Sequence, residues 1–93
     1  MKDQPYRVHH ILVKHGYEAE DLLRKLKEGA SFAELAKKFS ICSSAASGGD
    51  LGLLNAGQAD EDFEFAAQRL KVGEVSSQPV RTKFGYHLIW RRS

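Results

Sequence analysis

The chain begins with an apolar segment that has the character of a β-strand. The segment VHHILVK is rich in β-branched residues and predicts a strand from about residue 6 to residue 14, which Gly16 ends. Successive side chains of a strand point to opposite faces of its sheet. His9 and His10 therefore face opposite ways, and they cannot serve the same site.

Two amphipathic helices are expected next. Gly29 stands where a C-terminal cap glycine belongs, and Ser31 begins the second helix because Ser31 and Glu34 form a capping-box pattern. The apolar positions recur at i, i+3, i+4 and i+7, and they are Ala19, Leu22, Leu23 and Leu26, then Phe32, Leu35, Ala36 and Phe39. Each helix thus presents one apolar stripe.

The second half of the chain alternates turns with short apolar segments. The segment SICSSAASGG, residues 40–49, predicts a loop that can include a short helical turn. A third helix follows the acids DED at 60–62, carries Phe63, Ala66, Ala67 and Leu70 on one face, and ends at Gly73. Strands are expected at 50–54, 75–80 and 86–91, with a turn at 81–85.

This order of elements predicts a single α+β domain over residues 1–93. The last two strands are joined by a short connection and should form an antiparallel hairpin. Three helices with one apolar face each need a surface to cover, and a small sheet wrapped by helices provides it. A chain of 93 residues can bury one core but not two.

Composition narrows the class of protein and its partners. Hydrophobic residues make up 42% of the chain and charged residues 28%, which is an ordinary globular balance. A net charge of +2 without a basic stripe does not favour nucleic-acid binding, and no stretch is long and apolar enough for a membrane span. The single cysteine allows no internal disulfide, so we expect a reducing compartment, the cytoplasm. The N-terminal residues MKDQPYR have no apolar signal region, which leaves open a precursor from which a leader was removed.

Candidate chemistry is confined to four histidines, Cys42 and the glycine-rich segment SGGDLG. Zinc needs three or four ligands, and neither a CxxC nor an HExxH spacing is present, so no metal site is expected. SGGDLG is not followed by the Lys-Ser and long helix of a P-loop, and a turn with left-handed backbone at Gly48 and Gly49 explains it better.

Two interpretations remain open for the residues that could react. Cys42 could pair with a histidine as a thiol nucleophile, or it could be an apolar filler of the core. His10 and His87 both lie within apolar strand segments, and they could be buried histidines satisfied by hydrogen bonds. Residue patterns alone do not choose a reaction.

Four motifs in order resemble the parvulin family of peptidyl-prolyl cis–trans isomerases. They are HILVK at 10–14, SICSS at 40–44, GGDLG at 48–52 and FGYHLI at 84–89, and the segments between them have family-like spacing. The resemblance covers the chain from Val8 to Arg91 and implies a four-stranded antiparallel sheet wrapped by helices. It also implies that the catalysed process is rotation about the bond that precedes proline.

The resemblance assigns roles to individual residues of this chain. His10 and His87 take the places of the paired active-site histidines, Thr82 that of the hydroxyl bonded to them, and Cys42 a position that is usually Cys or Asp. The resemblance also implies a proline pocket, whose residues are Leu51, Ala59, Phe63 and Phe84. Ala59 is a departure, because the family commonly has Met there, and the pocket could be wider or shallower, with an acidic entrance.

The expected function is isomerisation of X–Pro bonds in unfolded or flexible polypeptides. We expect a monomer that uses no cofactor and acts without a covalent intermediate, with Cys42 as a pocket residue. Phospho-dependence is not expected, because the segment after the first strand offers only Lys14 and His15 where a phosphate clamp needs several donors. The alternative is a chaperone or scaffold module of the same fold that binds polypeptide with little catalysis.

Overall fold

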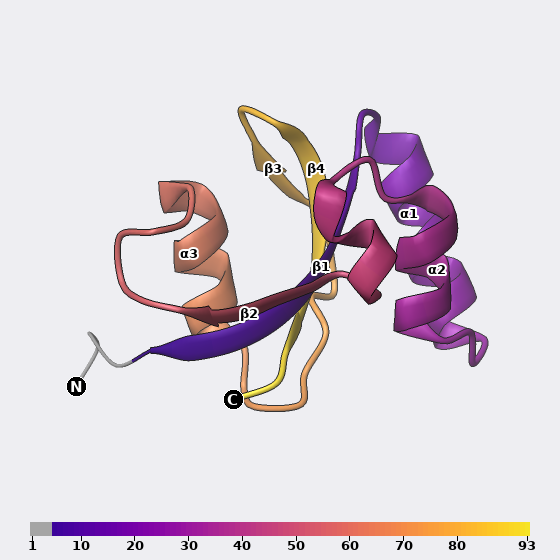
Figure 1. The fold of residues 1–93 in the computed structure, drawn as a ribbon. Coiled ribbons are helices and arrows are strands. Elements are labelled where there is room, and N and C mark those ends of the chain that lie inside the picture. Colours follow the sequence, from indigo (N-terminus) through magenta and orange to yellow (C-terminus); the bar gives the residue numbers. More distant parts are fainter. Residues whose placement is uncertain (1–4) are drawn as a thin grey trace.

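The structure, a computed structural model, describes residues 5–93 and contains one four-stranded antiparallel sheet (Figure 1). The strands lie in the order β2-β1-β4-β3, so the first and last long strands are neighbours at the centre. The elements in chain order are β1 (Tyr6–Val13), α1 (Gly16–Lys27), α2 (Phe32–Phe39), the 3-10 helix η1 (Ser43–Ser47), β2 (Asp50–Leu54), α3 (Glu61–Arg69), β3 (Val80–Thr82) and β4 (Gly85–Arg91). The predicted α+β class and element order are confirmed.

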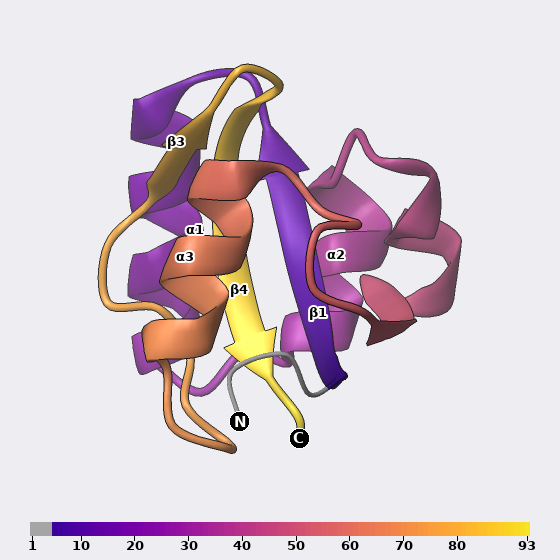
Figure 2. The ribbon, with the colours of Figure 1, turned by 90° about the vertical axis from the view of Figure 1, so that its left-hand side faces the viewer.

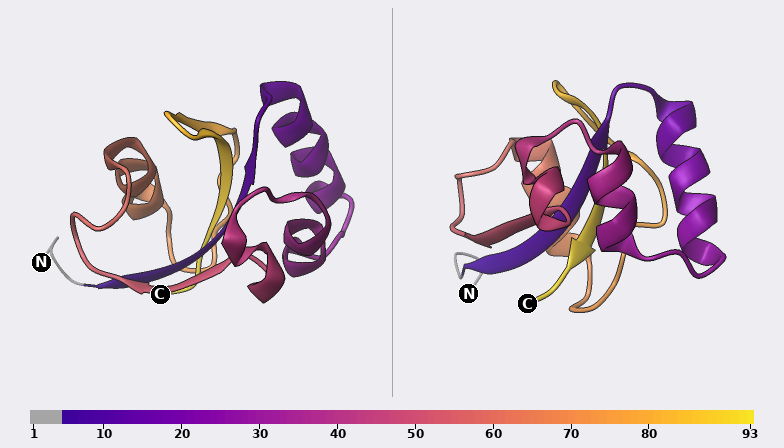
Figure 3. Two further views of the ribbon diagram at one scale, coloured as in Figure 1. Left: turned by 45° about the horizontal axis from the view of Figure 1, so that its top comes forward. Right: turned by 45° about the vertical axis from the view of Figure 1, so that its right-hand side comes forward.

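The helices divide between the two faces of the sheet. Helices α1 and α2 cover one face and α3 covers the other, as Figures 1 and 2 show and as the two further views of Figure 3 confirm. Strand alternation sorts the side chains accordingly. Ile11 and Val13 of β1 pack with the α1–α2 core, whereas Tyr6 and Val8 pack with Phe63 of α3.

The segment before the last hairpin differs from the prediction of a strand at 75–80 and a turn at 81–85. The strand β3 begins only at Val80, and Val75 makes an isolated bridge to Trp90 instead. Proline has no N–H to donate to a ladder, so regular pairing with β4 starts after Pro79. The turn shrinks to residues 83–84, because Thr82 already pairs with Gly85.

The third helix is also shorter than the pattern predicted. It ends at Arg69 and not at Gly73. The guanidinium of Arg91 in β4 donates to the backbone carbonyls of Gln68 and Leu70 at 3.1 and 2.9 Å, which satisfies the last carbonyls of the helix. A long-range contact that no local pattern contains therefore sets this end.

The loop between α2 and β2 includes the short helical turn that the sequence allowed, η1. Gly48 and Gly49 follow it with φ of 67° and 86°, as their left-handed use predicted. The carbonyl of Gly49 accepts a hydrogen bond from the His10 amide at 2.8 Å, so the loop lies directly against β1. In residues 5–93 there is no helix long and apolar enough to cross a membrane.

Replacing Gly49 tests how tightly this loop holds the histidine strand. A Cβ at Gly49 would stand 2.3 Å from the His10 carbonyl oxygen, whereas a Cβ at Gly29, with a φ of 102°, meets nothing within 4 Å. We expect Gly29→Ala to lower the free energy of unfolding by about 1 kcal/mol and Gly49→Ala by at least about 3 kcal/mol. Urea unfolding of both variants measures this difference, and equal losses would contradict it.

Candidate active site

One cavity of about 230 Å³ gathers most of the residues that the sequence singled out. It lies on the face of the sheet that carries α3, and its accessible wall is almost entirely apolar. Its lining residues are His10, Leu12, Cys42, Leu51, Ala59, Asp60, Phe63, Phe84 and His87. Larger surface depressions exist, but neither His10 nor His87 lines the others described.

Seven of the eight predicted site residues therefore line one cavity, and the eighth, Thr82, stands behind it bonded to His87. Leu12 and Asp60 also line the cavity, and neither was among the site residues predicted from the sequence. Strand alternation could have found Leu12, since it follows His10 by two residues and must share its face. Asp60 lines the cavity because it caps α3, with its Oδ1 accepting from the Asp62 and Phe63 amides at 2.9 and 3.3 Å.

A hydrogen-bonded chain of three side chains lies under the cavity. The Nδ1 atoms of His10 and His87 are 3.0 Å apart, and His87 Nε2 is 2.7 Å from Thr82 Oγ1. The hydroxyl oxygen also accepts the Phe84 amide at 3.1 Å, which ties the chain to the β3–β4 turn. All three side chains are at most 8% exposed, so the chain is part of the protein interior.

The hydrogen bonds between His10, His87 and Thr82 can run in either of two directions. In one, the Thr82 hydroxyl donates to His87 Nε2 and His87 Nδ1–H donates to His10 Nδ1; in the other, both bonds run the opposite way. In either order one nitrogen, Nε2 of His10, is left buried without a hydrogen-bond partner among residues 5–93. The direction of the hydrogen bonds between His10, His87 and Thr82 thus decides whether that nitrogen carries a proton or a lone pair.

Burial keeps both imidazoles neutral at physiological pH. Loss of hydration, together with the smaller effect of the neighbouring His87, lowers the pKa of His10 to about 4. Burial likewise lowers the pKa of His87 to about 4, against a small opposing effect of the Asp60 carboxylate. Neither His10 nor His87 therefore carries a positive charge at pH 7.

Aromatic contacts hold the two imidazoles in place. The rings of His10 and His87 are stacked at 5.2 Å, and the Phe63 ring meets both edge-on, at 5.5 and 5.1 Å. Phe63 is buried, whereas Phe84 at the rim is 57% exposed. A cavity below the roughly 300–1,000 Å³ typical of drug-sized ligands suits a single small apolar ring.

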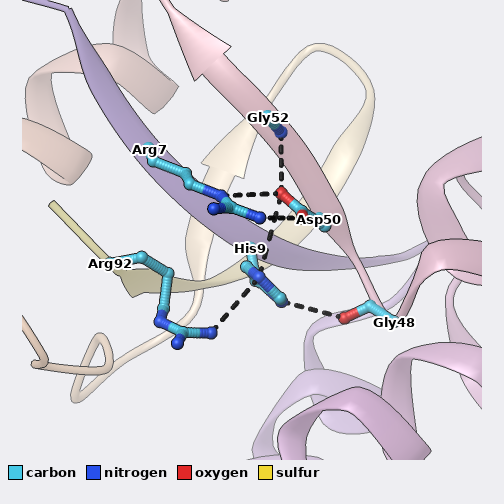
Figure 4. A network of polar contacts seen from close by, with 6 residues as sticks. All are labelled: Arg7, His9, Gly48, Asp50, Gly52 and Arg92. Atoms are coloured by element: carbon cyan, nitrogen blue, oxygen red, sulfur yellow. Dashed lines mark hydrogen bonds and ion pairs between the residues drawn. The ribbon is translucent and has the colours of Figure 1, made fainter.

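His9 lies on the opposite face of the sheet, as alternation predicted, within a separate polar network (Figure 4). Its Nδ1 is 3.2 Å from the Gly48 carbonyl oxygen, and its Nε2 is 3.4 Å from Arg92 Nη1. The centre of this network is Asp50, whose pKa is lowered to about 2 by the hydrogen bonds from Arg7 and the Gly52 amide. The network fixes the start of β2, from which Leu51 reaches the cavity.

Comparison with known proteins places the chain in a family. Residues 10–93 match the Rotamase model, described as the PPIC-type PPIase domain. The match covers most of the chain, so the chain belongs to the family of PPIC-type peptidyl-prolyl isomerase domains, the parvulins. The resemblance found in the four sequence motifs is thereby confirmed.

Relatives in sequence include foldases and chaperones. The chain is 52% identical over 84 residues to the foldase protein PrsA of Bacillus subtilis, which covers 89% of this chain and 28% of the foldase. It is 46% identical over 91 residues to the chaperone SurA of Methylobacillus flagellatus, covering 88% of this chain and 21% of SurA. The chain thus spans less than a third of the length of these curated relatives.

Solved structures agree with the fold. The crystal structure of PrsA from Bacillus subtilis aligns with a TM-score of 0.93 at 47% identity, over 99% of this chain and 36% of that one. The solution structure of NmPin, the parvulin of Nitrosopumilus maritimus, aligns with a TM-score of 0.84 at 44% identity, over 96% of both chains. The four-stranded parvulin-type sheet is therefore confirmed.

The neutral histidine pair predicts a pH dependence of stability. As the pH falls from 7.5 to 5, histidines of the unfolded chain take up protons near pH 6.5, whereas His10 and His87 stay neutral in the folded chain until about pH 4. The free energy of unfolding should therefore fall, by about 2 kcal/mol for each histidine at pH 5. Urea unfolding across this range measures the fall.

The exposed His15 provides the control for this measurement. The variant His15→Ala should retain the fall, because it leaves the buried pair untouched. A free energy of unfolding that stays constant between pH 7.5 and 5 would contradict the burial of a neutral pair.

Proposed function

We propose that the protein catalyses cis–trans isomerisation of X–Pro bonds in unfolded or flexible polypeptides and so assists protein folding. The observation that carries the proposal is the apolar cavity over the neutral His10–His87–Thr82 chain. The foldases and the chaperone among the relatives, and the family to which the chain belongs, support the same activity.

The chemistry suits such a cavity because no bond has to break. Rotation about the X–Pro bond has a barrier of about 18–20 kcal/mol, and a reduction of roughly 5–8 kcal/mol turns minutes into milliseconds. The amide loses its resonance when it twists and becomes less polar, so a dry apolar wall favours the twisted state. Leu51, Phe63 and Phe84 provide that wall and hold the proline ring while the chain beside it turns.

The buried histidines act in this mechanism by keeping the shape of the cavity. They are neutral and hydrogen-bonded to each other, Thr82 holds His87 through a second hydrogen bond, and Phe63 packs edge-on against both rings. Proton abstraction is not required of them, because bond rotation neither takes up nor releases a proton. Their fixed rings form the base against which the substrate amide twists.

Cys42 lines the cavity, and the part of the chain that the structure describes gives it no activating base. Within residues 5–93, its thiol makes no hydrogen bond to either imidazole, and a nucleophilic cysteine needs such a partner. We infer that the thiol contributes polarity and shape at the wall and that no covalent intermediate forms.

Two substitutions of Cys42 test this inference. Cys42→Ser should keep much of the activity, because a polar group of similar size remains at the wall, and Cys42→Asp should keep more, because Asp is the usual alternative to Cys at this position in the family that the chain resembles. NMR exchange rates on a short X–Pro peptide measure the effect. Loss of all turnover in Cys42→Asp, or a trapped thioester in the unaltered protein, would contradict the non-covalent mechanism.

A second candidate function is binding of extended polypeptide with little catalysis. The observation that favours it is Ala59 in the cavity wall, where the family commonly has the larger Met. Grip on the proline ring would be weaker there, while the exposed Phe84 still offers an apolar surface to a peptide. Binding of a peptide without faster exchange would support this candidate.

An exchange assay on X–Pro peptides that differ in the residue before proline tests the proposal. We expect faster cis–trans exchange than in buffer alone, with neutral or basic residues preferred, because the Asp60 carboxylate lines the cavity and repels an acidic neighbour. A phosphorylated residue before proline should slow turnover. Faster turnover of the phosphopeptide would overturn this preference and would assign the phosphate to the adjacent depression lined by Lys14, Arg81 and Lys83.

We further propose that the protein acts as a monomer in the cytoplasm on polypeptide substrates. A single cysteine fits a reducing compartment, and a net charge of +2 gives no particular attraction to nucleic acid. The apolar cavity needs no cofactor for bond rotation.

A further inference from the structure

A carboxylate on α3 joins two parts of the chain that the mechanism has not used. Oε1 of Glu64 accepts a hydrogen bond from the Tyr6 hydroxyl at 3.1 Å and another from the Gly57 amide at 3.0 Å. Tyr6 begins β1 and lies 58 residues from Glu64 in sequence. One oxygen atom therefore connects a central strand, a helix and the turn between β2 and α3.

The turn leads directly into one wall of the cavity. The Gln58 amide donates to the Asn55 carbonyl at 3.1 Å, and the Asn55 amide donates to the Gln58 side chain at 2.7 Å, so residues 55–58 close on themselves. Ala59 and Asp60 follow at once, and both line the cavity. The position of the turn thus determines the position of this wall.

Tyr6 is a fixed anchor for the junction. Its side chain is 1% exposed and packs with Val8, Phe63 and Ala67 on the α3 face of the sheet. Burial and the adjacent Glu64 raise the pKa of the phenol, so its proton stays in place to be donated. The strand that carries this anchor also carries His10, four residues on.

We propose that Glu64 is a positioning residue that sets where the wall formed by residues 59–60 stands relative to the sheet that carries His10. The inference rests on the proposed function, because the wall matters only if a proline ring occupies the cavity. The hydrogen bond from the Gly57 amide to Glu64 holds the turn that precedes Ala59 from outside the cavity.

Loss of the Glu64 carboxylate should weaken peptide binding more than it slows the bond rotation. Without the Glu64 carboxylate, the turn loses its hydrogen bond to α3 and α3 loses its hydrogen bond to Tyr6, while the histidine chain on the sheet is unaltered. The substrate must then order the wall when it binds. Once the peptide is bound, the ordered wall and the histidine chain are as before.

Four variants separate this role from general stability. Glu64→Ala removes the acceptor, and Glu64→Gln keeps a carbonyl oxygen that can accept from both donors. Tyr6→Phe removes one donor and leaves the buried ring. Glu20→Ala, on the exposed face of α1, makes the same change of charge away from the cavity and is the matched control.

The test measures three quantities for each variant by NMR: hydrogen exchange of the Gly57 amide, the Kd of a short X–Pro peptide, and the exchange rate of that peptide at saturation. For Glu64→Ala we expect faster hydrogen exchange at Gly57 and a Kd raised about fivefold, with the rate at saturation within about twofold of the unaltered protein. Glu64→Gln and Glu20→Ala should resemble the unaltered protein, and Tyr6→Phe should lie between.

Three results would overturn the proposal. They are unchanged Gly57 exchange in Glu64→Ala, an equal loss in Glu64→Gln, or a fall in the rate at saturation without a change in Kd. A loss of protection spread evenly over all amides would assign Glu64 a merely structural role. If the unaltered protein binds the peptide but does not speed its exchange, the proposed function fails, while Gly57 exchange and Kd still decide the role of Glu64.

Discussion

The pairing of β1 with β4 is the constraint on which the rest of the structure depends. The two strands come from opposite ends of the chain, and their antiparallel register places Leu12 opposite His87 and His10 opposite Ile89. The two histidines thereby share a face and bring their Nδ1 atoms within 3.0 Å, although 77 residues separate them in sequence. A shift of one residue would turn every one of these side chains to the other face.

Burial makes the site apolar, and it also has a free-energy cost for the two histidines. The same exclusion of water that favours a twisted, less polar amide lowers the pKa of both histidines, and the folded chain holds them neutral. The hydrogen bond between His87 and Thr82 and the edge contacts with Phe63 offset part of the cost, but Nε2 of His10 stays unpaired within residues 5–93. The packed elements of the fold thus hold the buried histidine pair in place despite its unfavourable free energy, a pattern typical of functional sites.

Local patterns predicted most of the elements, and they failed where distant groups decide. The strand from Tyr6, the cap at Ser31 and the left-handed glycines 48 and 49 all follow from near neighbours in sequence. The end of α3 does not, because Arg91 supplies the hydrogen bonds that close it. The strand expected at 75–80 likewise shifted, since pairing with β4 sets its register and Pro79 cannot take part.

The sequence by itself determined the alternation that separates His9 from His10 and the motifs that identify the family. Seven of the nine residues that line the cavity were predicted from it. Only the tertiary structure decided that Asp60 and Leu12 complete the wall and that one oxygen of Glu64 joins Tyr6 to Gly57. The physical reason is the distance along the sequence over which each effect acts. Periodicity and capping act over a few residues, whereas burial, pKa and the position of a wall arise from groups brought together by the sheet register.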